Sequence, residues 1–211
     1  MSLTLLLVIM TSVLSYQAFN NADMRNKMLF HPVSIRESGE SYRFLTHGFV
    51  HADWQHLLIN MLVLYQFGQI AEQIFSLIFG GSMGAIMFVF FYLSSIVFSA
   101  VPSYFKHKEN RYYAALGASG ATSALVFTYI FLDPWHWFLF PPLPAILFGA
   151  GYLWYSSYMD KKGMDNIGHD AHFWGAVYGI LFIVLSSLIY RPALLQRFIE
   201  LLLSGPRAFG G

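Results

Sequence analysis

The chain of 211 residues is 56% hydrophobic, 18% aromatic and only 11% charged, whereas about 25% of the residues in a soluble domain are charged. This composition excludes an ordinary soluble domain and indicates a membrane protein. The net charge of +1 gives no basic footprint for nucleic acid. The lack of cysteine excludes disulfides, thiol nucleophiles and thiolate metal sites.

Six apolar segments can cross the hydrocarbon core, which requires about 20 residues in a helix. They cover residues 1–22, 54–71, 73–105, 112–132, 134–159 and 171–190. Backbone polar groups must pair internally in lipid, and no segment alternates like a barrel strand, so each is predicted to be a helix. We therefore predict an all-α membrane protein with one domain at residues 1–190. The first segment should remain in the mature protein, because it has neither the basic start nor the cleavage site of a signal peptide.

Three further stretches also have recognisable features: a long polar segment, a proline-rich segment and the C-terminal tail. Residues 19–53 form the longest polar segment, and a loop of that length is usually functional or partly structured. The sequence PPLP at residues 141–144 should break the helix between the fourth and fifth spans. The fifth helix could then act as a gate for a substrate helix, or PPLP could be an ordinary connector. The C-terminal tail, residues 191–211, contains LLQRFIELLL, which predicts a helix at the membrane interface.

Polar residues inside the second segment are spaced for one helix face. His56 and Asn60 stand four residues apart in HLLIN. They can join helices by hydrogen bonds worth under about 2 kcal/mol. Alternatively they are functional, as ionisable residues within a membrane often are.

A serine and a histidine lie among small residues in the fourth and sixth segments. Ser119 lies in GASG, residues 117–120, where small residues either let two helices approach or leave space around a reactive oxygen. His172 shares a helix stripe with two glycines, Gly175 and Gly179. A histidine at that close contact could take the proton of Ser119 and make it a nucleophile. Asp170 or Asn166 is expected at the helix entry, and no third acid is predicted.

These three motifs together resemble the rhomboid intramembrane serine proteases of the bacterial type. HLLIN lies on the second of the six spans, GASG on the fourth and AHFWGAVYG (residues 171–179) on the sixth. This is the order in which the family has its motifs. The resemblance implies a six-transmembrane-helix rhomboid bundle with a membrane-embedded first loop. It also implies that Ser119 is the nucleophile and that His172 is its general base.

The resemblance extends to residues around this dyad. It implies that His56, Asn60 and the backbone N–H of Ser119 stabilise the oxyanion, a role that suits a helix N-terminus beginning at Ser119. Arg43 and His51 would brace the first loop. Four glycines would have structural roles near the site: Gly117, Gly120, Gly175 and Gly179.

One position departs from the family pattern. Four residues after the serine the family commonly has a tyrosine that packs on the histidine ring, whereas this chain has Ser123. We expect another aromatic side chain, Trp174 or Tyr178, to hold the imidazole.

By the same resemblance, the substrates are transmembrane proteins, the second partner is the lipid bilayer, and no metal or organic cofactor is required. The expected location is a bacterial inner membrane with the active site facing away from the cytoplasm. The positive-inside rule predicts the opposite orientation, because nine Lys and Arg residues lie on the side of residues 19–53 and three on the other.

Two alternatives belong to other functional classes. One is an inactive rhomboid-like protein that binds and escorts membrane helices, although loss of the serine or histidine usually marks that state. The other is a small transporter or channel, which usually needs acidic or basic residues in mid-span.

Overall fold

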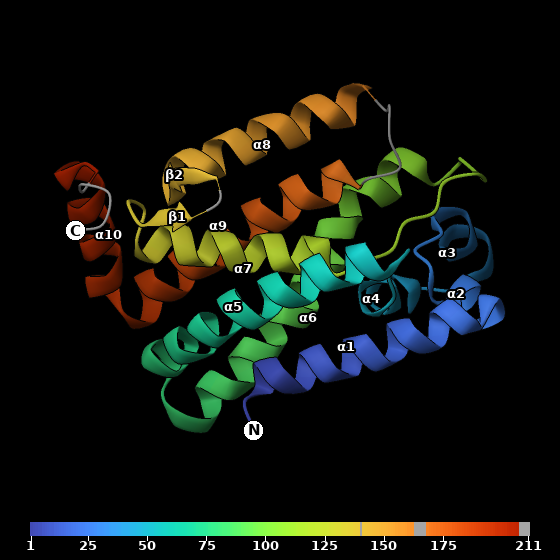
Figure 1. Ribbon diagram of the computed structural model, residues 1–211, viewed down its shortest axis with the longest axis horizontal. Helices are drawn as coiled ribbons and strands as arrows, with labels where there is room; N and C mark the ends of the chain where they lie inside the picture. Colours follow the sequence, from blue (N-terminus) through green and yellow to red (C-terminus); the bar gives the residue numbers. More distant parts are fainter. Residues whose placement is uncertain (140, 163–167, 207–211) are drawn as a thin grey trace.

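A helix occurs in each of the six predicted segments. The computed structural model describes residues 1–139, 141–162 and 168–206 (Figure 1). The six helices are α1 (Leu3–Asn20), α5 (Trp54–Phe79), α6 (Gly81–His107), α7 (Ser119–Leu132), α8 (Ala145–Lys162) and α9 (His169–Tyr190). Within the described residues, α1, α5, α6 and α9 are long and apolar enough to cross a membrane, and α7 is a shorter apolar helix. The all-α membrane bundle is therefore confirmed.

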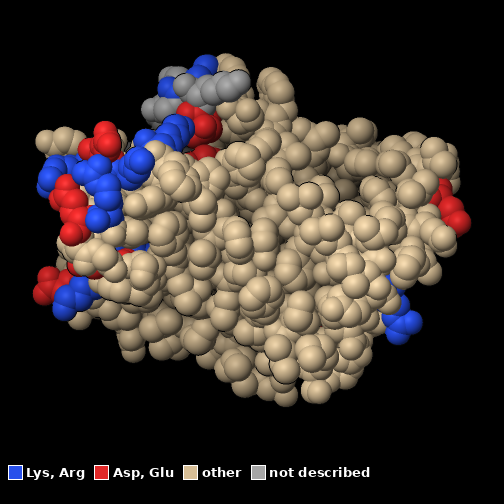
Figure 2. All heavy atoms as spheres, turned by 180° about the vertical axis from the view of Figure 1, so that it is seen from behind, with Lys and Arg blue, Asp and Glu red and all other residues tan. Residues whose placement is uncertain are grey.

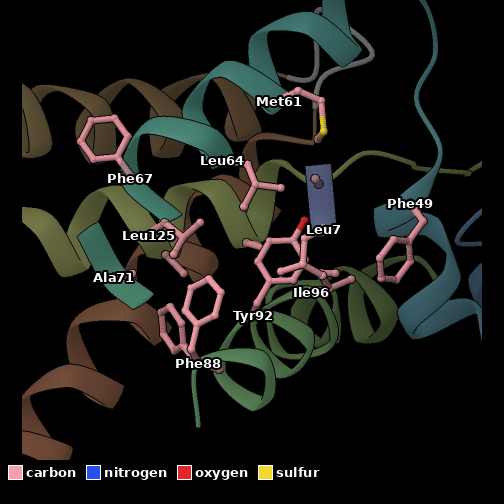
Figure 3. Packing of buried hydrophobic residues seen from close by; sticks show 14 of the residues in the cluster. Leu7, Phe49, Met61, Leu64, Phe67, Ala71, Phe88, Tyr92, Ile96 and Leu125 are labelled. Carbon is pink, nitrogen blue, oxygen red and sulfur yellow. The ribbon is translucent and has the colours of Figure 1, made fainter. Parts of the chain in front are cut away.

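Helix α7 forms the centre of the bundle. Ten of its 14 residues are buried, so neighbouring helices rather than lipid surround it. Figure 3 shows part of this core, where Leu7 of α1, Leu64 of α5 and Leu125 of α7 come together. Phe88 and Tyr92 of α6 belong to the same cluster, and both are fully buried. The core thus packs α7 against α5 and α6, and α1 packs on the same cluster through α5.

The predicted boundary between the second and third spans is wrong. We placed it at Glu72, whereas α5 continues to Phe79 and the chain turns at Gly80 and Gly81, which have φ values of 76° and 35°. The Glu72 carboxylate accepts hydrogen bonds from the backbone N–H groups of Leu3 and Thr4, both at 3.0 Å. These N–H groups have no partner within α1, and they stabilise the acid inside the bundle.

The first loop is folded into short helices at one end of the molecule. These are α2 (Ala22–Met28), α3 (Pro32–Ser38), α4 (Arg43–Thr46) and the 3-10 helix η1 (His47–Phe49). On the face shown in Figure 2, charged side chains gather at this end and leave a broad uncharged belt beside it. Such a belt suits the hydrocarbon region of a bilayer.

Arg43 holds this loop together. Its Nε donates to Glu40 Oε2 at 2.5 Å, and its Nη1 donates to the carbonyl oxygens of Asn26 and Leu29 at 2.7 and 2.8 Å. The guanidinium thereby ties α4 to the end of α2. The side chain is buried, so these hydrogen bonds satisfy a charge that would otherwise be costly to desolvate.

The proline-rich segment and the tail lie at the opposite end (Figure 1). PPLP breaks the helix as predicted, but it does so within an antiparallel hairpin of β1 (Trp137–Leu139) and β2 (Pro142–Pro144), which we did not predict. The tail contains the predicted helix, α10 (Pro192–Ser204). Arg191 Nε donates to the carbonyl oxygen of Leu77 at 3.1 Å, which anchors the start of α10 to α5.

Candidate active site

Helix α7 begins at Ser119, and its first turns lie against α9. A Cβ atom added to Gly175 would lie 2.8 Å from the carbonyl carbon of Gly120. One added to Gly179 would lie 2.7 Å from Cα of Ala124. Backbone contacts this close require glycine, and they bring the turn that carries His172 beside the turn that begins at Ser119.

Four candidate residues line one cavity of about 910 Å³ between the helices. Ser119 comes from α7, His172 from α9, and His56 and Asn60 from α5. Ser119, His56 and His172 are half-buried, and Asn60 is buried. The fold therefore brings together side chains from three helices, α5, α7 and α9, at one end of the bundle.

The His56 ring lies over Gly117, two residues before Ser119. A Cβ atom on Gly117 would be 2.6 Å from Cε1 and 2.8 Å from Nε2 of His56. The φ value of Gly117 is also 120°, a conformation that glycine adopts readily. Gly117 therefore makes room for the imidazole next to the start of α7.

Asn60 connects α5 to α7. Its Nδ2 donates to the carbonyl oxygen of His56 at 2.9 Å, and its Oδ1 accepts from Thr122 Oγ1 at 3.1 Å. The first bond lies within α5, and the second is an interhelical contact of the kind expected of a structural asparagine. Nδ2 carries a second N–H, which is the group that the oxyanion role requires.

The first loop holds the segment that leads to Ser119. Phe30 and Ala115 exchange two backbone hydrogen bonds of 2.9 and 3.0 Å, and the N–H of Gly117 donates to the carbonyl oxygen of His47 at 2.9 Å. His51 adds a side-chain contact, because its Nε2 accepts from the N–H of Ala118 at 3.3 Å. Four hydrogen bonds thus fix residues 115–118 before α7 begins.

His51 serves this contact as a neutral imidazole. Its Nδ1 lies 2.9 Å from Ser15 Oγ, and that hydroxyl donates to the carbonyl oxygen of Phe49 at 3.1 Å. Nδ1 therefore donates to Ser15, which leaves Nε2 free of a proton and able to accept from Ala118. Burial, with a smaller effect from His56, lowers the pKa of His51 to about 3.

Asp170 has a structural environment at the start of α9. Its carboxylate accepts from the N–H of Ala171 at 2.8 Å and from Ser103 Oγ on α6. These contacts fit the helix-entry role that we predicted, because a carboxylate is favourable near a helix N-terminus. The other candidate, Asn166, lies outside the described residues.

The prediction that Trp174 or Tyr178 holds the His172 ring is wrong. The Tyr178 hydroxyl is 2.6 Å from Ser94 Oγ on α6, and its ring stacks on Phe98 with 5.0 Å between centroids. Trp174 is 42% exposed. Both side chains point away from the His172 stripe, as expected for positions two and six residues along a helix of 3.6 residues per turn.

The ring stacked on His172 belongs to Tyr152 of α8. The ring centroids are 5.9 Å apart and the planes differ by 20°. The Tyr152 hydroxyl lies 2.7 Å from Ser123 Oγ. Sequence reasoning missed Tyr152 because no motif in HLLIN, GASG or AHFWGAVYG includes α8, and helical spacing reveals neighbours only within one helix.

The electrostatics of the cavity favour negative charge near Ser119. The N-terminus of α7 directs unpaired backbone N–H groups and the positive end of the helix dipole to this point. In the part of the chain that the structure describes, no cluster of three or more His, Asp or Glu side chains is arranged to hold a metal ion.

The molecule is a helical membrane bundle in which the half-buried Ser119 begins α7 and His172 lies on the facing helix α9. The sequence matches the Rhomboid domain family over residues 38–189. It is 30% identical over 175 residues to RHOMBOID-like protein 12, mitochondrial, of Arabidopsis thaliana. The aligned region covers 76% of this chain and 51% of the Arabidopsis protein. The chain thus spans about half the length of this relative, and it belongs to the rhomboid family.

Proposed function

We propose that the protein is an intramembrane serine endopeptidase that hydrolyses peptide bonds in or near transmembrane segments. The observation that carries this proposal is the shared cavity of Ser119, His172, His56 and Asn60 at the closest approach of α7 and α9. A serine that only mediated helix packing would not need a histidine and two further hydrogen-bonding side chains in the same cavity.

The proposed reaction uses a Ser–His dyad. His172 takes the hydroxyl proton of Ser119, and Oγ attacks the carbonyl carbon of the scissile peptide bond. The resulting oxyanion is stabilised by the N–H of Ser119, by His56 and by Asn60. The protonated His172 then gives its proton to the leaving amine, and water hydrolyses the acyl-enzyme with His172 again as base.

Transmembrane helices with a locally unstable segment are the proposed substrates, because a peptide bond must be extended to reach the serine. The cavity wall includes apolar residues of α5 and α8: Ile59, Val63 and Phe148. Ile59 is 55% exposed, so this wall continues to the outer surface of the bundle. We propose that a substrate helix enters between α5 and α8, with α8 as the gate.

The location is part of the same proposal. The protein is an integral membrane protein, and we assign it to a bacterial cell membrane with the active site facing away from the cytoplasm. Because the chain has no cysteine, single cysteines can report the orientation. Ser38→Cys on α3 should react with a membrane-impermeant maleimide in intact cells, and Ser82→Cys at the start of α6 should not. The reverse pattern would support the positive-inside orientation.

Cleavage of a reporter transmembrane protein in proteoliposomes tests the proposal. Wild-type protein should cleave it, and Ser119→Ala and His172→Ala should not, although both should remain folded. Ser99→Ala is the matched control, because Ser99 also lines the cavity but has no part in the proposed chemistry. Substrate binding without cleavage by wild-type protein would favour the escort function instead.

A further inference from the structure

We propose that Tyr152 is the positioning residue for the His172 imidazole, so that the gate helix α8, rather than α7, orients the general base. This inference rests on the proposed function, and it names a residue outside the motifs that identify the family. It follows from the two contacts of Tyr152, one through its ring and one through its hydroxyl.

The ring of Tyr152 covers one face of the imidazole. The two planes are within 20° of parallel and the centroids are 5.9 Å apart. Offset stacking of this kind is a favoured aromatic arrangement. The ring of His169 contacts the imidazole differently, edge-on at 5.8 Å and 77°. Of these two rings, Tyr152 is the one that presents its face to the imidazole and can limit rotation of the His172 ring.

The hydroxyl of Tyr152 fixes that ring against α7. It lies 2.7 Å from Ser123 Oγ, and Ser123 is buried with only 5% of its surface exposed. Ser123 stands one turn after Ser119 on the same face of α7. A small residue at position 123 therefore leaves the space that Tyr152 fills and gives its hydroxyl a partner.

The backbone of α8 is close enough to α7 to hold this contact. A Cβ atom on Gly149 would lie 2.8 Å from Cδ1 of Ile130 and 3.3 Å from the Phe127 ring. Gly149 precedes Tyr152 by three residues, so both lie on the face of α8 that meets α7. A shift of α8 away from α7 would withdraw the aromatic face from His172.

This arrangement links the orientation of the base to the position of the gate. A displacement of about 1 Å in a reacting group can reduce a rate by about 100-fold. We therefore expect that the proposed nucleophile reacts fastest when α8 is packed on α7, and that loss of the Tyr152 ring slows the reaction without abolishing it.

The rate at which a small fluorophosphonate labels Ser119 tests this inference without a substrate helix. Tyr152→Ala should label about 10- to 100-fold more slowly than wild type, after normalisation to folded protein. Tyr152→Phe keeps the ring that stacks on the imidazole and should label within about threefold of wild type, which corresponds to about 0.65 kcal/mol. The double variant Ser123→Tyr/Tyr152→Ala should regain most of the lost rate, because it supplies a ring from α7.

Trp154→Ala is the matched control, because it also removes an aromatic ring from α8 but from a side chain that is 69% exposed. It should label at the wild-type rate. The resonances of the His172 ring in histidine-labelled protein, assigned with His172→Gln, give a second reading that does not depend on activity. They should shift in Tyr152→Ala and be restored towards wild type in Tyr152→Phe.

Wild-type labelling and unshifted His172 resonances in folded Tyr152→Ala would overturn the inference and leave the proposed function intact. An equal loss in Tyr152→Phe and Tyr152→Ala would also overturn it, because the hydroxyl and not the ring would then be responsible. If wild-type protein is not labelled at all, the proposed function fails. The His172 resonances would then decide the stacking role alone.

Discussion

His51 Nε2 accepts a hydrogen bond of 3.3 Å from the backbone N–H of Ala118, the residue directly before Ser119. This bond joins the first loop to the point where α7 begins. The same imidazole contacts Ser15 of α1 through Nδ1 at 2.9 Å. His51 therefore connects three parts of the chain: α1, the first loop and the start of α7. We therefore propose that His51 positions the serine.

Removal of this side chain should weaken the fold and the site together. We expect His51→Ala to lower the free energy of unfolding by about 1–3 kcal/mol, because the buried N–H of Ala118 loses its partner. Thermal unfolding in detergent measures the stability, and fluorophosphonate labelling measures the serine. His51→Gln, which can still present an acceptor, should retain more of both. If His51→Ala matches wild type in both assays, the proposed positioning role is wrong.

The stability of the protein should fall in acid. Burial lowers the pKa of His47 to about 4 and that of His51 to about 3, both below the ordinary value of about 6.5. The unfolded chain therefore binds protons first as the pH falls below 6.5. Each histidine should reduce the unfolding free energy by up to about 1.4 kcal/mol per pH unit between pH 6 and 4.

The midpoint of thermal unfolding measured from pH 7.5 to pH 4.5 checks this expectation. His51→Gln removes one of the two groups and should show a shallower decline than wild type. An unchanged midpoint over that range in wild-type protein would mean that neither histidine is held neutral by the fold.

The contact of α7 with α9 should not tolerate a side chain at Gly179. Gly179→Val would place atoms against the backbone of Ala124, where even a Cβ atom lies 2.7 Å from Cα. We expect a loss of about 1–3 kcal/mol or more, and labelling that falls further than the folded fraction because His172 moves away from Ser119. Gly151→Ala is the control, because nothing lies within 4 Å of its added Cβ, and it should be neutral or stabilising.

Asn60 has two interpretations that kinetics can separate. If it only joins helices, Asn60→Ala and Thr122→Val should both lower thermal stability, and cleavage should fall in proportion to the folded protein. If it also donates to the oxyanion, folded Asn60→Ala should lose turnover while KM stays nearly constant. Thr122→Val should then retain turnover, because it removes the 3.1 Å bond to Oδ1 but leaves the amide N–H groups.

The size of that loss depends on the other donors. Removal of one donor from an oxyanion hole can cost on the order of 10²–10³ in turnover. His56 and the N–H of Ser119 would compensate here, so we expect about 100-fold or less. The variant His56→Ala/Asn60→Ala should lose more turnover than either single variant. A loss no greater than the loss of folded protein would return both residues to a structural role.

The helices were predictable because length and hydrophobicity are local properties of the sequence. The start of the fourth helix was not predictable from hydrophobicity, which extended that segment over residues 112–132, whereas α7 begins at Ser119. The continuation of α5 through Glu72 was not predictable, because the N-terminus of α1 stabilises the Glu72 carboxylate inside the bundle. That partner is nearly 70 residues away in the sequence.

The surroundings of His172 also include a partner that is distant in the sequence and could not be predicted from it. Spacing correctly placed His172 with Gly175 and Gly179 on one stripe of α9. It could not reveal that Tyr152 reaches the imidazole from α8, because contacts between helices depend on how closely their backbones pack. A small residue at position 123 was the available signal, and it indicated a vacant space but not the helix that fills it.

Covalent labelling with a fluorophosphonate, followed by peptide mapping, tests the central claim most directly. Wild-type protein should carry one adduct, on Ser119, and Ser119→Ala and His172→Ala should carry none while remaining folded, since only an activated hydroxyl attacks phosphorus readily. Ser99→Ala should be labelled like wild type. Equal labelling of wild type and Ser119→Ala, or an adduct on another serine, would contradict the assignment of Ser119 as the nucleophile.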